Sequence, residues 1–176
     1  PQFVDVPLDE LLDKDYAATL AEGVKRGDKA HVERFDPTEE PKDTTHVCAI
    51  DADGNCASMT HSLGMPSGAI TDGLGFMYNG CMSVFDPRPG RAASIAPGKG
   101  RFTAMCPTIV FKGDDPHLVI GAPGGTYITM GVLQGILNVV DFSMSVTDAI
   151  AAPRFTANSD TIDVVNRIPH YVTDEL

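Results

Sequence analysis

The sequence is poor in basic residues and lacks the residue spacings typical of a metal site. Its 176 residues include 13 basic and 24 acidic side chains, so the formal net charge is −11. That charge argues against nucleic acid or an anionic membrane surface as a partner, because both are polyanions. The four cysteines lack C-x-x-C spacing and the five histidines form no H-x-x-x-H pair, so no metal ion is expected. No apolar run approaches the roughly 20 residues that cross a bilayer.

Motifs for several common chemistries are also missing. The Pro-Gly-Lys-Gly run at 97–100 resembles a phosphate loop, but the required earlier glycine and the following Ser or Thr are absent. The sequence has no G-x-S-x-G elbow. It starts at Pro1 with no basic-then-apolar signal segment. We therefore expect a piece of a longer protein, and its compartment (periplasmic, extracellular or cytoplasmic) stays open.

The composition is globular, with a charged N-terminal part. Hydrophobic residues make up 43% and charged residues 21%. Residues 1–43 hold 12 acidic and 6 basic side chains, so a quarter of the length carries about half of the net charge. Apolar residues at helical spacing predict one or two short helices within 7–25. The charged stretch 26–43, broken by Gly and Pro, predicts a solvated linker.

A β-hairpin is predicted immediately after this linker. Residues 45–51 and 55–62 are rich in β-branched and small side chains, and Asp53-Gly54 separates them. Asp-Gly between two such runs is a strong hairpin signal. A two-residue loop pairs Thr45 with Ser62 and brings the Ser62 hydroxyl beside the Thr44-Thr45 corner, and a one-residue bulge would shift that pairing.

The rest of the chain predicts strands followed by helices. Three further runs favour strands: 75–79, 106–112 and 117–122. Residues 85–100, rich in Pro, Gly and Arg, predict an irregular loop, and 126–140 predicts an apolar, buried helix. A second helix is expected to begin at Ser145, with Asp148 in capping-box position, and to stop at Pro153. Strands packed against helices indicate an α+β fold.

Thr44 is the first candidate for chemistry. An N-terminal threonine can use its hydroxyl as nucleophile and its own α-amine as base, and the amine's pKa of about 7.7–8.0 suits that role. Thr44 is internal, so this chemistry requires cleavage of the Asp43–Thr44 bond, for instance by attack of the Thr44 hydroxyl on the preceding carbonyl. Judged by spacing alone, Thr44-Thr45 is better explained as the opening of a strand.

A glycine pair between a strand and a helix is the second candidate. Gly124-Gly125 at a helix N-terminus would expose backbone N–H groups with the positive end of the helix dipole behind them. This arrangement suits an oxyanion hole, although a plain strand-to-helix turn also explains it. Ser62 is the third candidate, with an ordinary polar strand end as the alternative.

Together and in this order, these motifs resemble the small-subunit region of the gamma-glutamyltranspeptidase family, which are N-terminal-nucleophile hydrolases. The similarity covers nearly the whole chain. Its most specific segments are Asp43-Thr44-Thr45-His46, Asp51-Ala52-Asp53-Gly54-Asn55, Ala96-Pro97-Gly98-Lys99, Pro107-Thr108-Ile109-Val110, Gly121-Ala122-Pro123-Gly124-Gly125, and Asn138-Val139-Val140-Asp141-Phe142 running to Ala151-Ala152-Pro153-Arg154-Phe155.

The resemblance implies a four-layered αββα fold, of which this chain supplies part. It implies self-cleavage at Asp43–Thr44, with Thr44 as nucleophile, Ser62 supporting it, and Gly124 and Gly125 as the oxyanion hole. Residues 1–43 would be the tail of a large subunit and residues 44–176 the catalytic region of the small subunit, joined as a heterodimer. The implied substrate is a small γ-glutamyl amide such as glutathione, and no cofactor is implied.

Departures from the family pattern bear on the substrate. Cys81 and Val84 stand where the family has polar groups that read the glutamyl α-amino group, and Asp86 is the candidate replacement. Thr103-Ala104 stands where a Ser-Ser pair often binds the α-carboxylate. Three alternatives therefore stay open: a γ-glutamyl enzyme, a related acylase acting on another amide, and a non-catalytic unprocessed member.

Overall fold

The computed structural model describes residues 3–31, 43–157 and 160–174, and its mixture of helices and hairpins confirms the α+β class. Each sheet among these residues is a two-stranded antiparallel hairpin. The strands are β1 (Thr44–Ile50) with β2 (Cys56–Ser62), β3 (Pro66–Ile70) with β4 (Met77–Asn79), β5 (Thr108–Lys112) with β6 (Asp115–Ile120), and β7 (Phe155–Thr156) with β8 (Asp163–Val164).

Residues 3–31 contain two helices, as predicted: α1 (Leu8–Leu11) and α2 (Lys14–Arg26). The Asp13 side chain accepts the Asp15 N–H and caps the start of α2. Gly27 ends α2 in the left-handed conformation. Residues 32–42 of the predicted linker lie outside the described residues.

The β1–β2 hairpin forms, but the predicted register was wrong by one residue. Thr44, rather than Thr45, pairs with Ser62, and Ile50 pairs with Cys56. The loop holds three residues, 52–54, because the Asp51 N–H donates to the Asn55 carbonyl and the Asp51 side chain accepts the Asn55 backbone and side-chain N–H groups. These hydrogen bonds, first of all that from the Asn55 side chain, lower the pKa of Asp51. The Asp51 carboxylate therefore selects the longer loop.

The three other predicted strands form, but they begin or end at residues different from those predicted. β4, β5 and β6 overlap the three predicted runs, whereas β3, β7 and β8 were missed. Every residue of β3 is exposed and the strand contains Pro66 and Gly68, so it lacks the alternation that predicts a strand. A short 3₁₀ helix, η1 (Cys81–Val84), precedes the irregular loop.

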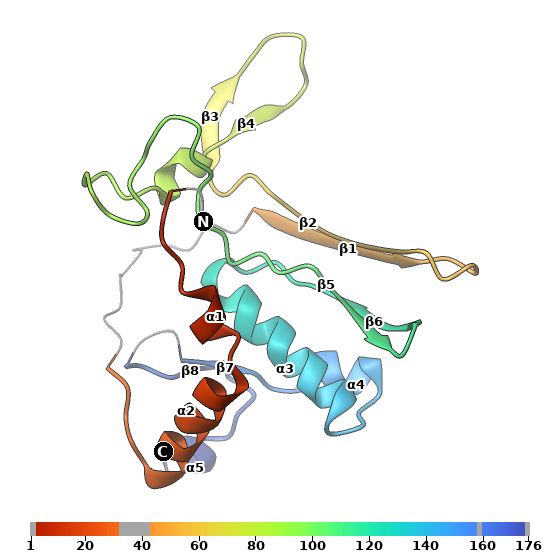
Figure 1. Ribbon diagram of the computed structural model, residues 1–176. Coiled ribbons are helices and arrows are strands. Elements are labelled where there is room, and N and C mark those ends of the chain that lie inside the picture. Colours follow the sequence, from red (N-terminus) through yellow and green to blue (C-terminus); the bar gives the residue numbers. More distant parts are fainter. Residues whose placement is uncertain (1–2, 32–42, 158–159, 175–176) are drawn as a thin grey trace.

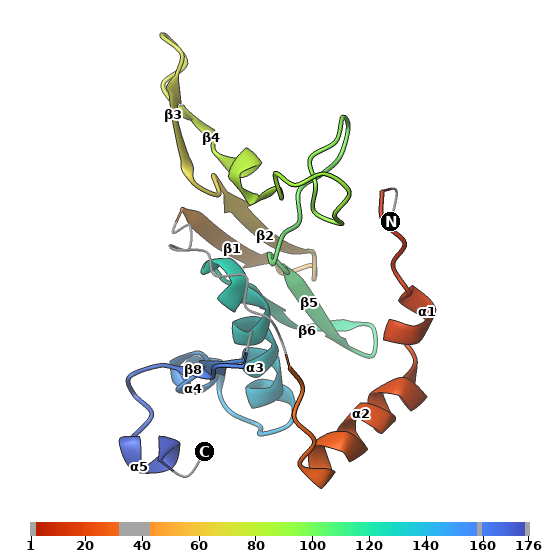
Figure 2. The ribbon, with the colours of Figure 1, turned by 90° about the vertical axis from the view of Figure 1, so that its left-hand side faces the viewer.

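Helix α3 (Ile128–Val140) lies beneath the β1–β2 and β5–β6 hairpins (Figures 1 and 2). It follows a 3₁₀ turn, η2 (Gly125–Tyr127). Among the described residues, the buried apolar side chains are Leu118 on β6, Ile128 and Val132 on α3, and Ala149. The prediction of a buried helix therefore holds for one face only, since Leu133 and Val140 are exposed.

The second helix is confirmed as α4 (Val146–Ala151). Ser145 caps it, because its hydroxyl accepts the Asp148 N–H and donates to the Asp148 carboxylate. A last short helix is α5 (His170–Thr173).

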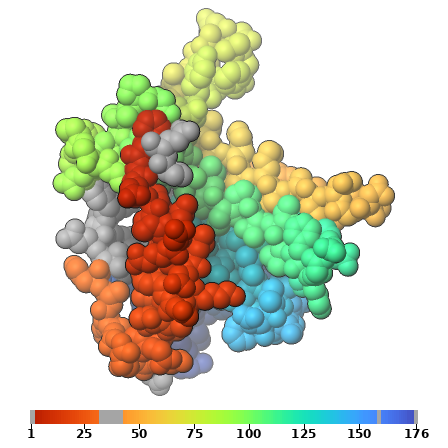
Figure 3. Space-filling model, in the orientation of Figure 1, coloured from red at the N-terminus to blue at the C-terminus, as the bar shows by residue number. Residues whose placement is uncertain are grey.

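The β1–β2 and β3–β4 hairpins project from the body of the chain (Figure 3). The face of β1–β2 away from α3 presents apolar side chains such as Val47 and Met59.

We expect Gly54→Ala to destabilise the protein by about 1–2 kcal/mol. Gly54 has φ of +83°, a conformation that strains residues with a Cβ. Urea unfolding of the full-length protein would measure the loss. Gly100→Ala is the matched control, because Gly100 has neither a positive φ nor any atom within 4 Å of an added Cβ. Equal stability of the two variants would contradict the expectation.

Candidate active site

Two hydroxyl groups meet at the open end of the β1–β2 hairpin. Thr44 begins β1, Ser62 ends β2, and the pairing of these residues places Thr44 Oγ1 2.9 Å from Ser62 Oγ. The Gly64 N–H donates to the same Ser62 oxygen at 2.8 Å. Both side chains are half-buried. Ser62 therefore lies beside Thr44 and contacts it directly, and this contact results from pairing with Thr44 rather than from the predicted pairing with Thr45.

The carbonyl of the Asp43–Thr44 peptide bond is also held. The Leu63 N–H donates to the Asp43 oxygen at 3.1 Å, which continues the pairing of the two strands by one residue. An N–H group at this oxygen favours negative charge on it. At the bond predicted to be cleaved, the Asp43 carbonyl thus accepts a hydrogen bond, and the following residue, Thr44, carries a hydroxyl group.

The glycine pair lies between β6 and α3. Gly124 has φ of +134° and Gly125 of +58°, both rare for other residues. Ala104 lies at the same end of α3, since its carbonyl accepts the Thr129 hydroxyl at 3.2 Å. Thr103, the other predicted carboxylate-binding residue, accepts the Met105 N–H on its own hydroxyl. Thr103-Ala104 is thus brought to the helix end that carries the glycine pair.

His46 connects the hairpin to the backbone that precedes the glycine pair, a contact for which the sequence predicts no role. Its ring lies against Gly121, three residues before Gly124: a Cβ built on Gly121 would be 2.2 Å from His46 Cε1. The available signal was its position in the strand, because residues two apart share a face and His46 follows Thr44 by two.

Cys81 lies beside the segment that follows Ser62. Its thiol donates to the Leu63 carbonyl at 3.4 Å, and a Cβ on Gly64 would be 3.0 Å from its sulfur. The Gly80 N–H donates to the carbonyls of Leu63 and Met65. Cys81 therefore lies against residues 63 and 64, which directly follow Ser62, and its role in substrate binding stays a prediction.

The Asp86 carboxylate is bound by Arg88, a residue of the same loop. Arg88 Nε and Nη2 donate to the two carboxylate oxygens at 2.9 and 2.7 Å, and the Arg88 backbone N–H donates to Oδ1 at 2.9 Å. The side-chain hydrogen bonds from Arg88 are the largest cause that lowers the pKa of Asp86, to about 2. The pKa of Arg88 is raised in turn by the same hydrogen bonds. The Asp86 side chain is only 12% exposed, whereas that of Arg88 is 49% exposed.

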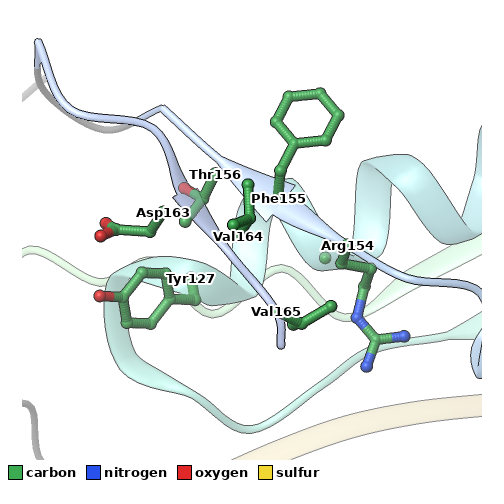
Figure 4. A pocket seen from close by; sticks show the side chains of 8 residues that line it. Tyr127, Arg154, Phe155, Thr156, Asp163, Val164 and Val165 are labelled. Atoms are coloured by element: carbon green, nitrogen blue, oxygen red, sulfur yellow. The ribbon is translucent and has the colours of Figure 1, made fainter. Parts of the chain in front are cut away.

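A pocket of about 310 Å³ lies on another side of α3 (Figure 4) and contains none of the predicted site residues. The buried Thr156 hydroxyl in it has no hydrogen-bond partner within the described structure. The residues lining it are Tyr127, Gly131, Arg154, Phe155, Thr156, Asp163, Val164 and Val165.

The described residues contain neither a cluster of metal-binding side chains nor a membrane-spanning helix. Within 3–31, 43–157 and 160–174, no group of three or more His, Cys, Asp or Glu side chains could hold a metal ion. In the same ranges no helix has the length and apolar character needed to span a bilayer.

Comparison with known proteins gives consistent matches. The family model for gamma-glutamyltranspeptidase matches residues 1–176. The chain is 38% identical over 182 residues to an acylase ACY 1 proenzyme and 36% identical over 170 residues to a glutathione hydrolase proenzyme, both from Pseudomonas strains. The crystal structure of a mutant gamma-glutamyltranspeptidase from Helicobacter pylori is 35% identical with a TM-score of 0.69, covering 74% of this chain and 78% of that one. This likeness confirms the predicted fold class.

The two curated relatives are much longer than this chain. The alignments cover 100% and 88% of this chain but 32% and 30% of the acylase and the glutathione hydrolase proenzymes. The chain thus spans about a third of the length of the curated relatives it matches.

We expect the Asp86–Arg88 pair to stabilise the protein above about pH 4 and to lose its effect as the pH falls toward 2. The folded pKa of about 2 lies below the ordinary value of 3.8, so the carboxylate form favours folding. Urea unfolding of wild type and Arg88→Gln across pH 5 to 2.5 would test this, and the variant should lose less stability over that range. Arg91→Gln is the control, because Arg91 contributes least to the shift in the pKa of Asp86. Parallel curves for wild type and Arg88→Gln would refute the expectation.

Proposed function

The chain belongs to the gamma-glutamyltranspeptidase family, and from that premise we propose that it carries the nucleophile of a self-cleaving amide hydrolase or transferase. The observation that carries the proposal is the 2.9 Å hydrogen bond between Thr44 Oγ1 and Ser62 Oγ. Ser62 orients the hydroxyl and can exchange a proton with it, since each hydroxyl is both donor and acceptor.

The first step is cleavage of the chain's own Asp43–Thr44 bond. Thr44 Oγ1 attacks the Asp43 carbonyl carbon, and the Leu63 N–H that already donates to the carbonyl oxygen stabilises the developing negative charge. The C–N bond breaks to give an ester on Thr44 and a free α-amine, and water then hydrolyses the ester. The names of both Pseudomonas relatives contain the word proenzyme, which supports a precursor of this kind.

The second step acts on substrate. The freed α-amine of Thr44 accepts the hydroxyl proton while Oγ1 attacks the substrate amide carbonyl, and the proton passes to the departing amine. Gly124 and Gly125 donate backbone hydrogen bonds to the oxyanion. Water or an amine acceptor then takes the acyl group from Thr44. Residues 1–43 end the large subunit, residues 44–176 form the catalytic region, and the two products stay together as a heterodimer.

The proposed substrate class is γ-glutamyl amides such as glutathione, in keeping with the glutathione hydrolase relative. The ion pair between Asp86 and Arg88 favours a second candidate. Because the Asp86 carboxylate already binds Arg88, it is poorly suited to bind the ammonium group of a substrate. An acyl group without the α-ammonium, as in an acylase, fits that arrangement, and one relative is an acylase proenzyme.

Self-cleavage can be tested by intact-mass spectrometry of the full-length precursor. We expect two fragments in the wild type, one starting at Thr44, and a single uncut chain in Thr44→Ala. Thr45→Ala is the matched control, because Thr45 lies on the opposite face of β1 and should leave cleavage intact. An uncut, folded wild type would exclude the catalytic proposal and favour the non-catalytic alternative.

The substrate class can be tested with a matched pair, γ-glutamyl-p-nitroanilide and glutaryl-p-nitroanilide, which differ only in the α-ammonium group. A site that reads this group should favour the glutamyl substrate by about 10–100-fold in kcat/KM, as expected for a hydrogen bond to a charged group. Equal rates or a preference for the glutaryl substrate would select the acylase candidate.

A further inference from the structure

The His46 ring is held at both nitrogens. Nδ1 lies 2.9 Å from Thr60 Oγ1, on the residue that pairs with His46 across the hairpin, and Nε2 lies 2.9 Å from Cys48 Sγ. Hydroxyl and thiol groups can donate or accept, so both can bond a neutral imidazole. The orientation of the ring is therefore fixed by the hairpin that carries Thr44.

The same ring lies directly against the backbone that leads to the glycine pair. A Cβ on Gly121 would lie 2.2 Å from Cε1, 2.5 Å from Nδ1 and 2.6 Å from Nε2 of His46. These distances are far below any real Cβ contact, so the ring occupies the space that a side chain at 121 would need. Only glycine permits this approach.

A second contact holds the same backbone. The Ser58 hydroxyl, on the same face of β2 as Thr60 and Ser62, donates to the Ile120 carbonyl at 3.2 Å. The hairpin thus touches Ile120 and Gly121 at two successive residues. The turn at Gly124-Gly125 begins three residues later, so its distance from Thr44 depends on these contacts.

We propose that His46 is a positioning residue: held by Thr60 and Cys48, its ring packs against Gly121 and sets the Gly124-Gly125 turn at the correct distance from the Thr44 hydroxyl. The inference rests on the proposed function, in which Thr44 is the nucleophile. Donors to the oxyanion act in the transition state, so a displaced turn lowers kcat and leaves KM nearly unchanged.

A double-mutant cycle in the full-length protein tests this role. Gly121→Ala should lower kcat about 100-fold while His46 is present, since a displacement of about 1 Å can have that effect. In a His46→Ala background, where the ring is gone, the same change should lower kcat less than about 5-fold. Gly131→Ala in α3 is the matched control, because an added Cβ there meets no atom within 4 Å and kcat should be kept.

Equal losses from Gly121→Ala in both backgrounds, or a loss expressed mainly in KM, would overturn the proposal. Should Gly121→Ala fail to fold, His46→Asn gives the same information. Its amide can keep the hydrogen bond to Thr60 but lacks the far side of the ring that faces Gly121. We expect kcat to fall about 10-fold with an unchanged pH profile; a wild-type kcat, or the loss of one limb of the profile, would contradict a positioning role.

The behaviour of the wild-type protein shows whether the proposed function or only the role of His46 has failed. A precursor that is neither cleaved nor active on any amide would remove the proposed function, and the positioning role with it. An active wild type with additive losses in the cycle would remove the role of His46 alone.

Discussion

The arrangement of the candidate site depends on the register of one hairpin. The Asp51 carboxylate closes a three-residue loop, and that loop makes Thr44 the partner of Ser62. With a two-residue loop, Ser62 would pair with Thr45 and face the other side of the sheet, away from the Thr44 hydroxyl. The geometry of the proposed nucleophile is thus determined at the far end of both strands, by a turn remote from Thr44.

The same face of the hairpin also fixes the surroundings of Thr44. His46 and Ser58, on alternate positions of the two strands, contact the end of β6 just before the glycine pair. Beyond Ser62, the Leu63 carbonyl accepts hydrogen bonds from Gly80 and Cys81, so the predicted substrate-binding residue Cys81 lies against the continuation of β2. One strand pair therefore carries the proposed nucleophile and contacts both the backbone at Ile120 and Gly121 and the predicted binding residue Cys81.

The sequence predicted these parts unequally, for physical reasons. Local signals were sufficient for the hairpin and for the Ser145 cap, because turn and capping chemistry involve residues close in the chain. The register required the side-chain hydrogen bonds of Asp51, which no propensity describes. The contact of His46 with Gly121 joins residues 75 positions apart, and only the packing of β6 on the hairpin reveals it. Asp86 was expected to meet substrate, and its engagement by Arg88 two residues later was overlooked.

The cysteines bear on how the pieces of the protein would stay together. All four are free thiols and all lie after Thr44, at 48, 56, 81 and 106, so residues 1–43 contain no cysteine. The described residues before the proposed cleavage site contact the rest of the chain noncovalently, for example where the Lys99 ammonium lies over the Phe3 ring and where the His31 ring meets the Asp160 carboxylate. If the Asp43–Thr44 bond is cleaved, residues 1–43 themselves can form no disulfide with the fragment that follows, and noncovalent contacts of this kind are what they contribute to holding it.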